Sequence, residues 1–206
     1  MKPEELHAIA SELGLQFDED SRSIYGTQSG YLLFLQETDV KNQFRLCVSV
    51  SLNGNPADSE ENELVWDEFK SESLPNLSTL SINQYLVSFV VKGAMRKSKT
   101  IEKLQTLITD LVAFLETHHF VQVCAYSGQE GPVGLYQLGD SIFLINEESY
   151  QLLKSNLQIE LDSYQNQKEN VLLGAVGALL GALIGGAVAL FIARLGYVAM
   201  VAGIVL

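Results

Sequence analysis

The sequence predicts an α+β fold, in which an antiparallel sheet carries helices on one face and is followed by a hairpin, a connecting helix and a C-terminal transmembrane helical hairpin. Three observations indicate this fold. Two stretches with helical apolar spacing enclose the first 119 residues, the segments between them alternate apolar and polar side chains, and residues 171–206 contain one charged side chain, Arg194. We therefore expect a soluble domain joined to a membrane anchor.

Two helices are expected in the soluble domain, over residues 3–13 and about residues 98–118. Pro3 suits a first helical turn, the acidic Glu4 and Glu5 complement the positive end of the helix dipole, and Gly14 can end the helix. The second helix has an apolar stripe at steps of three and four residues, made of Ile101, Leu104, Ile108, Leu111 and Leu115.

Strands are expected between these helices. Residues 31–36 and an earlier Ile-Tyr-Gly stretch are largely apolar, and residues 44–52 and 84–92 alternate with period two, which is typical of strands with one solvent-facing side. The order of helix, three or four antiparallel strands and helix also occurs in several bacterial secretion chaperones and peptide-binding modules. This is a likeness of fold and carries no function by itself.

Two charged segments of the domain need an interpretation. Residues 53–78 are acidic, and we expect a surface loop with Trp66 tucked onto the domain, because the acids lack the spacing and the glycine of a calcium-binding loop. Residues 92–99 gather the basic side chains Lys92, Arg96, Lys97 and Lys99. We expect a solvated turn there, and contact with anionic lipid headgroups is the alternative.

The charge balance excludes one class of partner. All 25 acidic residues and 12 of the 13 basic residues lie in residues 1–170, so that part carries 12 − 25 = −13 charges. Such a domain repels phosphates, and we expect no binding to nucleic acid.

An apolar run over residues 171–193 predicts a membrane span. These 23 residues form a helix of roughly 35 Å, which is enough to cross a hydrocarbon core about 30 Å thick. Glycines at four-residue steps share one helix face, where another backbone can approach closely. We expect helix packing at this face and at a second apolar segment, residues 196–206, through Gly174, Gly177, Gly181, Gly185, Gly186, Gly196 and Gly203.

The second apolar segment spans about 16 Å, roughly half a bilayer. We therefore expect that the chain continues beyond Leu206, with a short re-entrant piece as the alternative. No positive start followed by an apolar core opens the sequence, so we expect no cleaved signal peptide. Lys154 and Lys168 precede the span and Arg194 follows it. The expected location is the plasma membrane, with the N-terminal domain in the cytoplasm.

Residues 120–150 resemble a degenerate zinc ribbon. Cys124-Ala-Tyr-Ser127-Gly128 is similar to a Cys-x-x-Cys-Gly knuckle, a hairpin pattern follows it, and Asn146-Glu-Glu-Ser149 takes the place of the second knuckle. Serine and asparagine are poor zinc donors, so we expect no metal at Cys124, Ser127, Asn146 and Ser149.

The ribbon-like stretch and the glycine-rich tract over residues 174–203 together resemble a group of uncharacterised bacterial integral membrane proteins. These proteins place a small cytosolic α+β domain and a four-cysteine ribbon ahead of glycine-rich spans. The resemblance implies further spans beyond Leu206 and no known chemistry. The expected parts are an α+β domain over 1–119, the ribbon-like hairpin over 120–150, a connecting helix over 151–170, and transmembrane segments over 171–193 and 196–206.

No pattern for catalysis or for a cofactor is present. Phosphate loops, dinucleotide fingerprints and zinc-protease motifs are absent from the sequence, and no orienting acid is evident for joint action of Cys124 with His118 and His119. We expect a protein that is not an enzyme and binds no cofactor.

Two functions remain open. The first is a membrane-anchored module whose cytosolic domain binds a protein or peptide, including one that recruits partners to the membrane, while the glycine-faced helices self-associate. The second is a subunit or the N-terminal part of a small multi-span transporter or channel, in which the helices are the working part.

Overall fold

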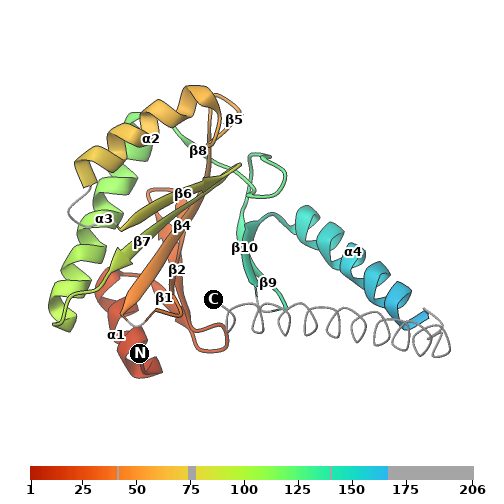
Figure 1. The fold of residues 1–206 in the computed structure, drawn as a ribbon, viewed down its shortest axis with the longest axis horizontal. Coiled ribbons are helices and arrows are strands. Elements are labelled where there is room, and N and C mark those ends of the chain that lie inside the picture. Colours follow the sequence, from red (N-terminus) through yellow and green to blue (C-terminus); the bar gives the residue numbers. More distant parts are fainter. Residues whose placement is uncertain (41, 74–77, 140, 167–206) are drawn as a thin grey trace, which may run out of the picture. The chain divides into compact units, whose positions relative to one another are not determined.

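The computed structural model describes residues 1–40, 42–73, 78–139 and 141–166 (Figure 1). Residues 1–156 form one compact unit, and the described part of the second unit is the end of one helix. The fold is α+β with antiparallel strands, as the sequence predicted.

The main sheet is antiparallel throughout. Its strands lie in the order β1 (Gln16–Asp18), β2 (Ser23–Gln28), β3 (Tyr31–Glu37), β4 (Gln43–Leu52), β7 (Leu86–Lys92) and β6 (Thr79–Asn83). The far end of β4 also pairs with two short strands, β5 (Asn55–Pro56) and β8 (Val121–Gln122). The two strands with the clearest alternation, β4 and β7, are neighbours at the centre, with Leu46 opposite Phe89 and Val48 opposite Val87.

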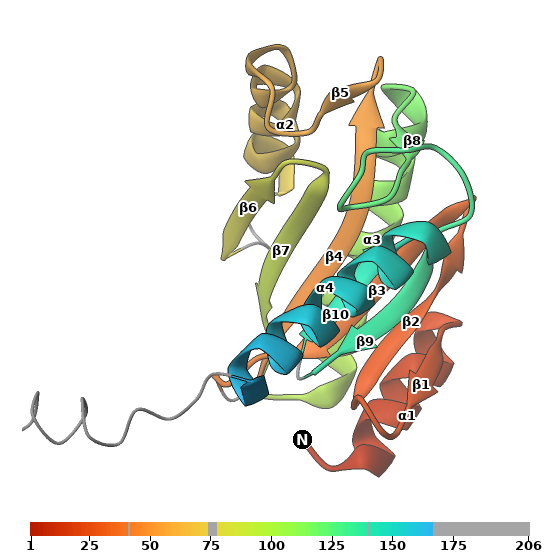
Figure 2. The same ribbon diagram turned by 90° about the vertical axis from the view of Figure 1, so that its right-hand side faces the viewer.

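Three helices cover one face of this sheet, α1 (Pro3–Leu13), α2 (Glu60–Ser73) and α3 (Lys97–Thr117), as Figures 1 and 2 show. The predicted first and last helices are confirmed to within one residue. Gly14 ends α1 with a φ of 68°, a left-handed conformation that glycine adopts without strain. The apolar stripe of α3 is buried against alternate residues of β3, β4 and β7, so the core lies between the helices and the sheet.

The acidic segment 53–78 is not a loop, so this part of the prediction was wrong, whereas Trp66 packs onto the domain as predicted. It contains β5, the helix α2 and, beyond the undescribed residues 74–77, the first residue before β6. Asn62, Trp66 and Phe69 recur at helical spacing and are 2%, 1% and 2% exposed. The acids occupy the other face of the helix. The net charge of the segment does not reveal that acidic and apolar side chains lie on different faces.

A two-stranded hairpin, β9 (Gly134–Leu138) and β10 (Ser141–Ile145), forms where the sequence predicted one. Leu144 of β10 packs with Phe34 and Cys47 on the face of the main sheet that the helices leave free. The helix α4 (Glu147–Asn166) follows the hairpin directly. Burial of this second, smaller apolar cluster fixes the hairpin to the sheet.

The first turns of the helices differ in charge. Helices α1, α2 and α4 each begin with acidic side chains, which complement the positive end of the helix dipole. Helix α3 has no acid in its first turn, and Lys97 and Lys99 stand there instead. Cations at this end of a helix are unfavourable by about 0.3–1 kcal/mol each. Lys99 is ion-paired with Glu102 one turn later, but Lys97 does not serve the stability of that helix.

None of the four described helices has the length and hydropathy of a membrane span. The expected spans, residues 171–193 and 196–206, lie outside the described residues.

The burial of α2 predicts that two apolar side chains of this helix, Phe69 and Leu64, contribute very differently to the free energy of unfolding. Phe69→Ala should lower the free energy of unfolding by about 3–5 kcal/mol, because Phe69 is 2% exposed. Leu64→Ala should change it by less than about 0.5 kcal/mol, because Leu64 is 76% exposed. Denaturant titration followed through the fluorescence of Trp66, the sole tryptophan, measures both. Equal effects of the two changes would show that α2 does not pack as described.

Candidate functional site

Three of the four ribbon-like positions are joined by hydrogen bonds around Cys124. The Cys124 thiol donates a hydrogen bond to the Ser149 hydroxyl, with 3.2 Å between Sγ and Oγ. The backbone N–H of Asn146 donates to Cys124 Sγ at 3.5 Å, and the Asn146 side-chain oxygen accepts a hydrogen bond from the backbone N–H of Ser149 at 2.9 Å. Residues 22 and 25 positions away in the sequence thus meet Cys124 at one buried sulfur atom.

The fourth position, Ser127, lies in the tight turn that follows Cys124. The backbone N–H of Gly128 donates to the Cys124 carbonyl at 2.8 Å, which closes this turn. Gly128 has a φ of 70°, and a Cβ at this position would collide with the Tyr85 ring. Glycine is therefore required here by both backbone conformation and space.

The two thiols of the protein have opposite electrostatic surroundings. Burial raises the pKa of the Cys124 thiol, but hydrogen bonds with Ser127, Ser149 and the Asn146 backbone outweigh this effect and leave the pKa below its ordinary value. Burial also raises the pKa of Cys47, and there the hydrogen bond with Ser88 is too weak a compensation. The pKa of Cys124 is thus shifted in the direction opposite to that of Cys47.

One soft ligand does not make a metal site. Within the described residues, no group of three or more histidine, cysteine, aspartate or glutamate side chains is arranged to hold a metal ion. No histidine hydrogen-bonds to Cys124 in this part of the chain either, and the His118 ring packs on Phe114 with 4.4 Å between ring centroids. The helix-packing glycines from Gly174 to Gly203 lie outside the described residues.

A second candidate site, on the exposed side of α2, was missed by the sequence analysis. Leu64 is 76% exposed. On a helix surface its neighbours are the residues three and four positions away, and all four are exposed acids: Glu60, Glu61, Asp67 and Glu68. We call Leu64 with these four acids the acidic face. The helical spacing of Asn62, Trp66 and Phe69 was the signal that could have revealed it.

The acidic face continues into a groove between α2 and α3. The groove has a volume of about 530 Å³. It is lined by Glu68, Phe69, Asp110, Ala113, Phe114, Thr117 and His118. Phe69 and Phe114 are 2% and 8% exposed, so the rings support the floor, while Glu68 and Asp110 are exposed acids beside it. The site therefore offers negative charge with a small apolar area.

The acids of α2 are not explained by pairing within the molecule. The helix sequence contains six acidic residues and one basic residue. The ion pairs found in the described part of the chain, Met1 with Glu37 and Lys99 with Glu102, involve none of them. Like charges at steps of three and four residues destabilise a helix by a few tenths of a kcal/mol per pair. An apolar side chain amid such acids suits a partner segment that is both basic and apolar.

The convergence at Cys124 predicts that a metal site can be restored. The triple variant Ser127→Cys, Asn146→Cys, Ser149→Cys should bind one Zn²⁺ per chain, because three of the four positions are already joined by hydrogen bonds at Cys124 and zinc takes four thiolate ligands. Zinc content of the purified protein, and the absorption spectrum after exchange to Co²⁺, measure this. The same triple variant with Cys124→Ser should bind zinc far more weakly. A triple variant that keeps the Trp66 fluorescence but binds no zinc would contradict the ribbon-like geometry.

Comparison with known proteins adds no relative. No protein-family model matches the chain, and a search of curated proteins finds no match to it.

Proposed function

We propose that this protein is a membrane-tethered interaction module, which presents its α+β domain on the cytoplasmic face of the membrane and binds a protein partner through the acidic face of α2. The observation that carries the proposal is the exposed Leu64 within its ring of four acids. Glu60 and Glu61 also complement the helix dipole, and Asn55 donates a hydrogen bond to Glu61, but no described residue forms an ion pair or a hydrogen bond with the side chains of Asp67 and Glu68.

The tether is supported by the sequence that follows the domain. After α4, whose described end is Asn166, the residues from Val171 to Ala193 carry no polar side chain. A run of this length costs little free energy in lipid and much in water. The in-phase glycines Gly177, Gly181 and Gly185 favour close packing of this segment with another helix, in a second copy or a partner.

The proposal also requires that the α+β domain folds without the apolar run of residues 171–193. Both apolar clusters of the described residues lie within residues 1–145, so the domain does not need the apolar run to bury its own side chains. A self-sufficient domain that is acidic over most of its surface remains dissolved next to a membrane and is free to contact soluble partners.

The tether predicts the behaviour of the protein on cell fractionation. The full chain should remain in the membrane pellet after washing with alkaline carbonate and should be released by detergent, because a spanning helix is not held by charge. A variant that ends at Asn166 should appear in the aqueous supernatant. Recovery of the full chain in the supernatant without detergent would remove the tether from the proposal.

The acidic face predicts a charge-dependent contact in cells. A photo-crosslinking amino acid in place of Leu64 should give a discrete adduct, and the same probe in place of Val121, which is 41% exposed on β8, should not. The double change Glu61→Lys and Glu68→Lys should lower the adduct yield about tenfold or more, as expected for the loss of several charge contacts.

The matched control for this experiment is Glu12→Lys and Glu19→Lys. It alters the net charge by the same amount at exposed acids away from α2. Equal loss with both pairs would show that overall charge, and not the acidic face, governs the contact.

A further inference from the structure

We propose that the loop leading into α3 rests on an anionic lipid surface, an inference that builds on the membrane tether proposed above. The loop surface consists of Lys92, Met95, Arg96 and Lys97, together with the tip of the neighbouring loop at Val40, and we call it the basic end. All five side chains are exposed. The acidic face occupies a different helix, so the domain has two charged surfaces of opposite sign.

The first support is that basic residues stand at the N-terminal end of α3, where the helix dipole favours acidic ones. Of the four described helices, α3 begins with basic residues and the other three begin with acids. The preceding residue, Arg96, adds a further positive charge at the same place. Because the positive end of the helix dipole repels these cations, their presence indicates a role outside the helix itself.

The second support is an apolar side chain held out into solvent among these cations. Met95 is fully exposed and Val40 is 58% exposed. Basic side chains around protruding apolar ones are the combination that binds the interface of anionic membranes, where the cations meet headgroups and the apolar groups enter the acyl boundary. Nucleic acid would use the cations and leave Met95 without a partner.

The loop is fixed in this exposed position by hydrogen bonds. The Asn42 side chain donates to the Ala94 carbonyl at 3.0 Å, and the Gly93 N–H donates to the Asn42 carbonyl at 2.8 Å. The buried Thr100 hydroxyl accepts a hydrogen bond from the Ala94 N–H at 2.9 Å. On the other side of Met95, the Arg96 carbonyl accepts a hydrogen bond from the Lys99 N–H at 3.1 Å, so Met95 projects from a backbone that is held on both sides.

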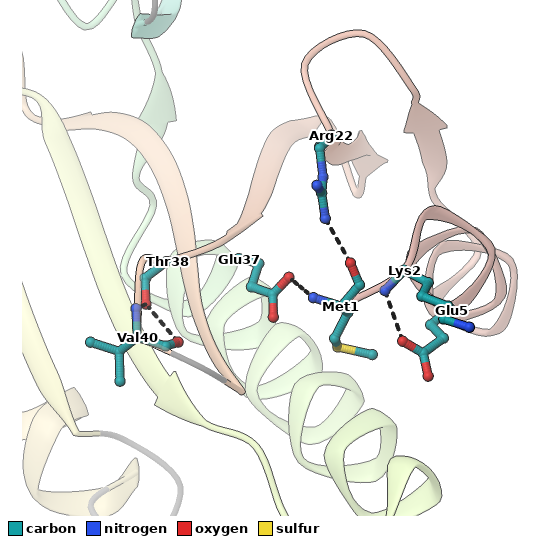
Figure 3. A network of polar contacts seen from close by, with 7 residues as sticks. All are labelled: Met1, Lys2, Glu5, Arg22, Glu37, Thr38 and Val40. Atoms are coloured by element: carbon teal, nitrogen blue, oxygen red, sulfur yellow. Dashed lines mark hydrogen bonds and ion pairs between the residues drawn. The ribbon is translucent and has the colours of Figure 1, made fainter.

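Most of the acids nearby are already engaged. Glu37 is ion-paired with the N-terminal amine, and Glu5 accepts a hydrogen bond from the Lys2 N–H, as Figure 3 shows. The same view shows Val40 next to Thr38, whose hydroxyl is bonded to the Val40 backbone. Glu102 pairs with Lys99, and Asp39 is exposed on the Val40 loop. Lys92, Arg96 and Lys97 have no ion pair with any described residue.

The two charged surfaces lie at opposite ends of α3. The helix has 21 residues and is about 30 Å long. Lys97 begins it, while Phe114 and Thr117 at its other end line the groove that adjoins the acidic face. Contact of the basic end with lipid would therefore direct the acidic face away from the membrane, where a soluble partner can reach it.

Brominated lipids, which quench tryptophan on contact, test this arrangement in the full chain. Trp66 is 1% exposed and provides a constant background. In vesicles of brominated phosphatidylcholine with about 30% phosphatidylglycerol, Met95→Trp should lose about half of its added emission relative to unbrominated vesicles. The matched control is Leu64→Trp, which places an exposed tryptophan on the acidic face and should lose none.

The loss at Met95→Trp should disappear in purely zwitterionic vesicles and when Arg96→Glu and Lys97→Glu are added. Equal quenching at Leu64→Trp, or quenching that survives these charge changes, would overturn the orientation. Absence of quenching at Met95→Trp in a chain that still floats with the vesicles would overturn this inference alone. A chain that does not float with the vesicles would contradict the proposed tether.

Discussion

The burial of Trp66 is the interaction on which the surfaces of this protein depend. Its ring lies 5.0 Å from Phe120, 5.4 Å from Phe114, 6.1 Å from Phe89 and 6.2 Å from Phe69, measured between centroids. Phe89 belongs to β7, Phe114 to α3, Phe120 to the segment after α3, and Phe69 to α2 itself. The Trp66 side chain therefore packs α2 against both the sheet and α3. The indole N–H has no hydrogen-bond partner in the described structure, which costs free energy, and the aromatic burial must exceed that cost. Without this anchor the acidic side chains of α2 would have no reason to form one face.

The arrangement of charge along α3 gives the domain a direction. Local stability explains acids at the start of a helix and basic residues at its end, and here α3 has neither. An acidic helix, α2, packs beside α3 and presents its charges around Leu64, while cations gather where α3 begins. Both surfaces carry repulsion that the folded domain does not relieve within itself. Unrelieved repulsion between like charges is typical of binding surfaces. Because one surface is acidic and the other is basic, the two favour binding partners of opposite charge.

Cys124 links two segments of the chain through hydrogen bonds. Hydrogen bonds with Asn146 and Ser149, at the start of α4, converge on the sulfur atom, and the tight turn that follows Cys124 is closed by the Gly128 N–H on the Cys124 carbonyl. In a zinc site the metal would join these two segments. Here the thiol, the Ser149 hydroxyl and the Asn146 amide do so with neutral hydrogen bonds, and the hairpin also gains stability from the apolar contact of Leu144 with Phe34 and Cys47. Packing and hydrogen bonding thus join Cys124 to the start of α4.

The sequence by itself determined the elements whose periodicity is long and regular. It predicted α1, β3, β4, β7 and α3 from the spacing of their apolar side chains, and the β9–β10 hairpin from the ribbon-like stretch. The membrane span expected over residues 171–193 lies outside the described residues and stays a prediction. The sequence also named the positions that meet at Cys124, through a resemblance. It did not reveal α2, since a helix with six acids and a narrow buried stripe has the average composition of a loop. Only the tertiary structure decided which side of that segment is buried, and therefore where the acidic face lies. The physical reason is that Trp66 and Phe69 acquire their partners from β7, α3 and Phe120, which are distant in the chain.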